Sequence, residues 1–132
     1  MKGYKEDIEM AVLQNTNFRE VVYTAAHSQL VIMSIEPSSE IGMETHKGTD
    51  QFFRFEKGTG KVVIDENEYL VSDGDSVIVP AGAKHNIINT SSSEALKLYT
   101  LYSPAHHKDG VVYATKAEAD AAVEKFDGVT TE

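Results

Sequence analysis

The chain of 132 residues is long enough for one compact domain and leaves little room for a second. It has 41% hydrophobic residues, 25% charged residues, no cysteine and no apolar run of membrane-spanning length. This composition excludes wholesale disorder, disulfides, thiolate metal sites and a transmembrane helix. The net charge of −9 repels phosphate groups, so we expect no nucleic acid and no anionic membrane as partner. The N-terminal residues are too mixed in charge for a secretory signal, and we expect a cytoplasmic protein.

From about residue 18 to residue 102 the sequence is typical of short strands. Runs of β-branched, aliphatic and aromatic residues alternate with Gly, Pro, Asp, Asn and Ser turn signals. In chain order, the predicted strands cover residues 18–24, 29–35, 51–55, 61–64, 68–71, 76–79, 85–89 and 96–102. This regular spacing predicts an all-β sandwich or barrel, because α/β folds would place helices between the strands.

The C-terminal region predicts one short amphipathic helix over about 115–127. Thr115 and Glu118 have the spacing of a capping box. Apolar residues then recur at helical spacing from Ala119 to Phe126. We therefore expect a helix packed on the outside of the β domain, while the N-terminal stretch 5–14 is ambiguous.

Two segments contain side chains that could bind a metal ion. Glu44 and His46 are two residues apart, so in an extended chain both point to the same face. Gln51 opens the next strand, and Phe53 and Phe55 continue its face. We predict that these three residues point inward, because the charged residue between the two phenylalanines prefers solvent.

The second segment spans residues 74–89. It combines a Gly turn, a short apolar strand, a Pro-x-Gly corner and a His that opens the next strand. This order resembles the second motif of the cupin superfamily, in which Gly, Pro, Gly, His and Asn recur at fixed spacing. The motif is matched at every position, by Gly74, Pro80, Gly82, His85 and Asn89.

The first cupin motif is matched in spacing and altered in identity. His46, Gln51 and Gly58 lie at the distances of the family's second His, its Glu and its closing Gly. Gln51 therefore replaces the usual Glu, and Glu44 replaces the usual first His. The five-residue lead-in also fails, since only one residue separates Gly42 from Glu44. The resemblance covers roughly residues 30 to 102.

The resemblance implies an antiparallel double-stranded β-helix, the jelly-roll barrel of the cupins, with one divalent metal inside. The four ligand positions correspond to Glu44, His46, Gln51 and His85. Two imidazoles and a carboxylate suit non-haem Fe(II), and Zn²⁺ accepts the same donors. Mn²⁺ and Ni²⁺ also remain open. The ligand set is similar to that of cupin-type phosphomannose isomerases, with Glu and Gln exchanged. An alternative is a cupin that has lost its metal.

The implied function is that of a metal-dependent enzyme acting on a small polar or anionic molecule, of the dioxygenase or the sugar-phosphate isomerase type. The alternative is a non-catalytic ligand-binding or sensor protein, which the lack of an obvious acid or base other than Glu44 favours. No catalytic residue is identified. Candidate residues for a substrate pocket, which could equally belong to the barrel core, are Phe53, Phe55, Ile87, Leu98 and Tyr102.

Three further expectations complete the sequence analysis. We expect a single cupin domain over 1–132, with a core at roughly 18–102 and a C-terminal extension that contains the helix. Small cupins commonly pair, so we expect a homodimer. Asn89 is expected to hold a turn or a strand end. His106 and His107 are expected in a surface loop, and the alternatives are that they shade the barrel mouth or bind adventitious metal.

Overall fold

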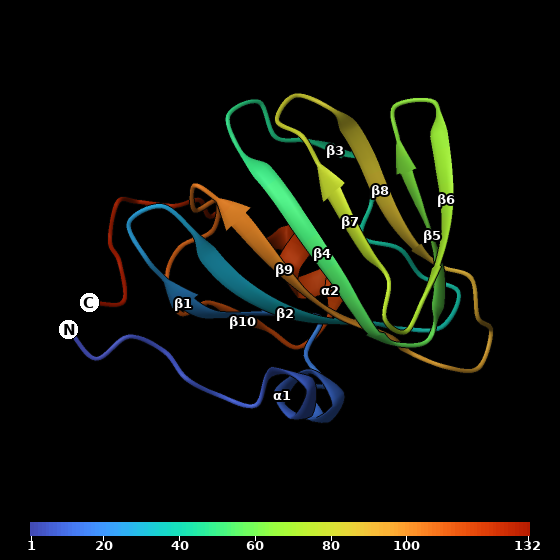
Figure 1. The fold of residues 1–132 in the computed structure, drawn as a ribbon, viewed down its shortest axis with the longest axis horizontal. Helices are drawn as coiled ribbons and strands as arrows, with labels where there is room; N and C mark the ends of the chain where they lie inside the picture. Colours follow the sequence, from blue (N-terminus) through green and yellow to red (C-terminus); the bar gives the residue numbers. More distant parts are fainter.

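A computed structural model describes residues 1–132 and shows two antiparallel sheets that face each other as a jelly-roll barrel (Figure 1). The six-stranded sheet has the order β10-β1-β2-β9-β4-β7. Its strands are β1 (Arg19–Thr24), β2 (Gln29–Ile35), β4 (Asp50–Lys57), β7 (Ser76–Val79), β9 (Leu96–Ser103) and β10 (Val112–Tyr113). The four-stranded sheet has the order β3-β8-β5-β6. Its strands are β3 (Glu44–Thr45), β5 (Thr59–Ile64), β6 (Asn67–Ser72) and β8 (Lys84–Asn89).

The core lies between the sheets, because residues of alternating burial line their inner faces. In β9, every second residue from Leu96 to Tyr102 is buried, and the residues between them are half-buried. In β4, Gln51, Phe53 and Phe55 are buried, so the predicted inward set is confirmed. All eight predicted strands are present. The sequence did not indicate the two-residue strands β3 and β10.

Two glycines allow the chain to cross from the six-stranded sheet to the four-stranded sheet between β4 and β5. Gly58 has a φ of +94°, which residues with a side chain rarely adopt, and a Cβ there would lie 2.6 Å from the carbonyl oxygen of Ala95. At Gly60 a Cβ would lie 2.8 Å from both the carbonyl oxygen of Ile88 and a methyl group of Leu96. The crossing therefore requires residues without side chains.

Asn89 holds the end of β8, as predicted. Its amide nitrogen lies within 3.1 Å of three carbonyl oxygens, those of Ile35, Glu36 and Glu94. Its amide oxygen accepts a hydrogen bond from the backbone of Ser91 at 3.0 Å. A single buried side chain thus satisfies backbone groups of the segments that follow β2 and β8.

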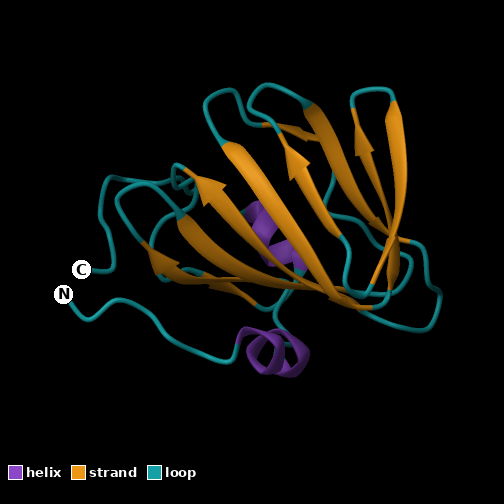
Figure 2. Ribbon diagram, in the orientation of Figure 1, coloured by secondary structure: helices purple, strands orange, loops and turns teal.

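Two short helices lie outside the barrel, α1 (Ile8–Gln14) and α2 (Lys116–Ala121) (Figure 2). The predicted cap of α2 is confirmed, because the hydroxyl of Thr115 accepts from the backbone of Glu118 at 3.2 Å. The helix ends six residues earlier than predicted, since the following residues bind the loop after β9. The backbone of Phe126 donates to the carbonyl of His106, and the Glu124 carboxylate accepts from that loop. Neither helix is long and apolar enough to span a bilayer.

Candidate metal centre

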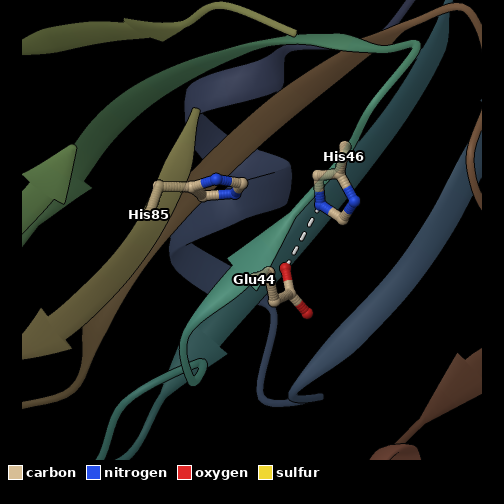
Figure 3. A group of neighbouring side chains, drawn as sticks. All are labelled: Glu44, His46 and His85. Atoms are coloured by element: carbon tan, nitrogen blue, oxygen red, sulfur yellow. Dashed lines mark ion pairs between the residues drawn. The ribbon is translucent and has the colours of Figure 1, made fainter. Parts of the chain in front are cut away.

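Two strands of the four-stranded sheet bring two of the predicted ligands together. Glu44 in β3 is the direct cross-strand partner of His85 in β8. In an antiparallel pair, such partners project from the same face of the sheet, so both side chains point into the barrel. His46 follows β3 by one residue and returns toward the same space (Figure 3).

The Pro-x-Gly corner of residues 80–82 is tied to the segment that carries His46. The backbone of Gly82 donates to the carbonyl of His46 at 2.8 Å. The backbone of Ala81 donates to the carboxylate of Asp50 at 2.8 Å. The corner therefore positions both histidine segments, since His85 follows it by three residues.

The three side chains converge on one point. The candidate ligand atoms of Glu44, His46 and His85 all lie within 4.8 Å of one another. The Nε2 atom of His46 lies 3.3 Å from a carboxylate oxygen of Glu44, and the two imidazole ring centres are 5.1 Å apart (Figure 3). This arrangement can surround a single cation with two nitrogens and a carboxylate.

The hydrogen bonding of the histidines fits a metal ion. Nδ1 of His85 lies 3.0 Å from the carbonyl oxygen of Ala83, a pairing that requires a proton on Nδ1 and leaves the lone pair on Nε2. The Nε2 atom of His85 is buried and has no hydrogen-bond partner. The Nε2 atom of His46 is also buried and makes no hydrogen bond of good geometry; only the Glu44 carboxylate lies beside it, at 3.3 Å. Buried nitrogens of this kind almost always have a partner, and a divalent cation would supply one to both.

Gln51 contributes a further unpartnered atom from the opposite sheet. Its amide nitrogen donates to the hydroxyl of Thr100 at 3.0 Å, which fixes the orientation of the amide. Its amide oxygen is buried and has no partner. Gln51 lies opposite Tyr102 in the pairing of β4 with β9, and the Tyr102 ring is 5.8 Å from the His46 ring. The amide oxygen is thus a donor of the kind that a metal ion accepts.

Charges around Glu44 keep its carboxylate ionised. Burial is the largest single influence and would raise its pKa, but His46, Arg19 and His85 together outweigh burial and hold the pKa of Glu44 below its usual range. The three converging side chains therefore offer one carboxylate and two imidazoles, and the role of Gln51 as a fourth ligand stays a prediction.

A second layer of aromatic side chains, formed by Tyr102, His106 and His107, lies against His46. The His106 ring lies 4.1 Å from the His46 ring and is stacked on the Tyr102 ring at 5.4 Å. His107 is buried, with 7% of its surface exposed. Both histidines lie in a loop, as expected, but His107 is buried and His106 is half-buried against His46, so the expectation of surface exposure is wrong for His107.

His107 connects Tyr102 with Glu124. Its Nδ1 lies 2.8 Å from the Glu124 carboxylate, and its Nε2 lies 3.2 Å from the Tyr102 hydroxyl. Burial lowers the pKa of His107 and raises that of Tyr102, so the neutral ring donates to Glu124 and accepts from the phenol. This assignment satisfies all three groups.

Gln29 fixes the backbone of the same loop from inside. Its amide oxygen accepts from the backbone of His106 and His107, and its amide nitrogen donates to the carbonyl of His107 at 2.8 Å. The side chain is fully buried. The sequence signal for this contact is weak, because Gln29 is one of two polar residues in the otherwise apolar segment 29–35.

The five predicted pocket residues all belong to the apolar core cluster, and Tyr102 in addition lies beside His46. Their role in lining a substrate pocket stays a prediction. The three surface hollows of the molecule lie elsewhere, and the largest, of about 360 Å³, is lined by residues of the segments 64–71 and 75–78.

Comparison with known proteins identifies the family. The model of the cupin domain family matches residues 31–102. An uncharacterized protein of Acanthamoeba polyphaga mimivirus is 36% identical over 92% of this chain and 78% of its own length. The uncharacterized Bacillus subtilis protein YrkC is 40% identical over 92% of this chain and 68% of its own length. The chain belongs to the cupin domain family.

Solved structures agree with this assignment. The crystal structure of the Bacillus halodurans protein BH2720 superimposes with a TM-score of 0.89 at 37% identity, covering 92% of this chain and 96% of that one. KdgF from Halomonas sp. superimposes with a TM-score of 0.61 at 19% identity, covering 65% of this chain and 78% of that one. The second similarity concerns the fold alone.

Proposed function

We propose that this cupin binds one divalent metal ion through Glu44, His46, Gln51 and His85. The observation that carries the proposal is a set of three buried atoms that make no hydrogen bond, Nε2 of both histidines and Oε1 of Gln51. The ionised carboxylate of Glu44 lies 3.3 Å from Nε2 of His46. Burying three such atoms without a partner is unfavourable, and one cation would satisfy them together. Two imidazoles and a carboxylate suit Fe(II), and Zn²⁺, Mn²⁺ and Ni²⁺ are the other candidates.

We further propose that the centre acts on a small polar or anionic molecule as an enzyme of the oxygenase or isomerase type. A bound divalent ion supplies a Lewis acid and a template for orienting the substrate. The chain itself holds His85 in one tautomer through Ala83 and keeps the Tyr102 phenol protonated beside His46. With one carboxylate, a divalent centre has a charge of about +1, which favours an anionic ligand.

A non-catalytic ligand-binding role is the second candidate, and the covering of the site favours it. None of the surface hollows borders Glu44, His46, Gln51 or His85. His106 lies directly against His46. A site that is partly covered, with the Glu44 side chain 34% exposed, is consistent with a ligand held without turnover.

Metal analysis of the untagged protein tests the proposal. We expect about one divalent ion per chain by mass spectrometry, and we expect His46→Ala and His85→Ala to abolish binding. The matched control is His27→Ala, because His27 is exposed and far from the ligand segments in sequence. Full metal occupancy in both variants would contradict the ligand assignment. Oxygen uptake or isomerisation by the loaded protein would establish an enzyme, and a retained ligand without turnover would establish a binding protein.

Two broader expectations also remain proposals. We propose that residues 1–132 form a single cupin domain, which is supported by one continuous apolar core cluster. We also propose a homodimer, by analogy with other small cupins. Light scattering that gave the mass of one 14.5 kDa chain would contradict the dimer.

A further inference from the structure

Arg19 is a buried cation on the inner face of the barrel. It occupies the first position of β1, between β10 and β2, and shares its face of the strand with the core residue Val21. Only 7% of its surface is exposed. The chain has only one other arginine, Arg54, and its side chain is 38% exposed.

No group of the protein pairs with this charge. The Nε atom of Arg19 is buried without a hydrogen-bond partner, and none of the five ion pairs of the molecule includes it. Its neighbour is the Phe18 ring, 5.2 Å from the guanidinium carbon. A buried guanidinium is normally paired with an anion, because removing it from water is costly.

Arg19 faces the same interior as the candidate metal centre. Val21, on its face of β1, packs in the core cluster that also contains Tyr102, and the Tyr102 ring lies 5.8 Å from the His46 ring. Burial is the largest influence on the pKa of both Tyr102 and Glu44, and Arg19 lowers both values. The two carboxylates nearest the centre are already engaged, Glu44 with His46 and Glu124 with His107. The interior that holds the centre thus contains a cation without a counter-ion.

We propose that Arg19 binds a carboxylate group of the ligand of the metal centre. A planar guanidinium offers parallel N–H donors that match the two oxygens of a carboxylate. A single arginine suits one negative charge, whereas a phosphate dianion normally requires several donors or a helix N-terminus. The substrate class is therefore a small organic acid with a second oxygen donor for the cation. This inference rests on the proposed metal centre for that second contact.

Calorimetry with oxalate, malonate and succinate tests the inference on zinc-loaded protein. We expect at least one diacid to bind and the neutral analogue malonamide not to bind. Arg19→Gln should weaken diacid binding by roughly 10- to 100-fold, the usual range for a lost charged hydrogen bond. It should not weaken zinc binding, because it removes a positive charge that acts on Glu44. The matched control, Arg54→Gln, should behave as the wild type. Equal diacid affinity in wild type and Arg19→Gln, or no diacid binding by the wild type, would overturn the inference.

Three further measurements distinguish a misfolded variant, a phosphate ligand and a missing metal site. If Arg19→Gln does not fold, Arg19→Lys replaces it as the test variant, because lysine keeps the positive charge and lacks the parallel N–H donors. An unchanged diacid affinity in Arg19→Lys would overturn the inference. Inorganic phosphate should bind more weakly than the best diacid, and tighter Arg19-dependent binding of phosphate would refute a carboxylate ligand. Metal-free protein should retain weaker Arg19-dependent diacid binding. If the wild type binds no zinc but still shows the weaker Arg19-dependent diacid binding, the proposed metal centre is refuted and the role of Arg19 is not.

Discussion

Glu44 lies directly opposite His85 in the antiparallel pairing of β3 with β8. This register explains how a glutamate can take the place of the family's first histidine, because the position itself faces the other ligands whatever residue occupies it. A slip of one residue in this pairing would turn Glu44 out of the barrel. Two hydrogen-bonded residues of β3 thus determine which side chains reach the centre.

Gln51→Glu should tighten divalent metal binding by at least about tenfold, because it adds a second carboxylate to the ligand set. The metal-free variant should be less stable than the wild type, since it buries another negative charge beside Glu44. Competition with a chromophoric chelator measures the first effect and thermal unfolding the second. Gln14→Glu adds the same charge at an exposed position and should change neither. Unchanged or weaker metal affinity in Gln51→Glu would show that Gln51 is not a ligand.

Asn89→Ala should lower the free energy of unfolding by about 2–4 kcal/mol, because it leaves several buried carbonyl groups without a donor. Asn67→Ala is the matched control. The Asn67 amide also donates to a carbonyl, that of Ile64, but at the surface, and its loss should cost less than about 0.5 kcal/mol. Denaturant unfolding compares the two variants, and similar losses would contradict the structural role of Asn89.

Gly60→Ala should destabilise the fold by more than about 2 kcal/mol, because its Cβ would overlap the Ile88 carbonyl and the Leu96 side chain. At Gly48, no atom lies within 4 Å of an added Cβ. Gly48→Ala should therefore leave stability unchanged or raise it slightly. Chemical denaturation of both variants checks the prediction, which fails if Gly60→Ala is as stable as Gly48→Ala.

His107 should make the metal-free protein sensitive to mild acid. Burial lowers its pKa in the folded chain, so the unfolded chain binds the proton first. Its contribution to stability should therefore be lost as the pH falls below about 6.5, by at most about 1.4 kcal/mol per pH unit for one proton. His107→Gln should flatten this slope, and the exposed control His27→Gln should not. Unfolding measured between pH 7.5 and 5 in the presence of a chelator compares the variants; parallel slopes would contradict the assignment.

The sequence was most informative where local rules decide the structure. Alternating burial placed Gln51 with Phe53 inside the barrel, and the Pro-x-Gly corner placed His85 at the start of its strand. Contacts between distant segments were not predictable in the same way. The helix of the C-terminal region ends at Ala121 because Glu124 and Phe126 bind the loop after β9. These tertiary contacts compete with continuation of the helix, and the helical spacing of apolar residues does not reveal them.

Arg19 and His107 illustrate the same limit within the site. Each is a single polar residue near apolar sequence, and no motif distinguishes it from a surface residue. Their burial follows from the tertiary fold. Arg19 faces inward from β1, and the loop after β9 places His107 between Tyr102 and Glu124. Only the assembled barrel shows that both face the interior that holds Glu44 and Tyr102.

Two hydrogen bonds, from Gly82 to the His46 carbonyl and from Ala81 to the Asp50 carboxylate, join the loop that carries His46 to the corner that precedes His85. The positions of the two histidines are therefore coupled. An insertion or deletion in either segment would disturb both imidazoles at once. An engineer who wished to graft this centre onto another barrel would have to transplant the two loops as a pair, and directed evolution of either loop alone would act on both.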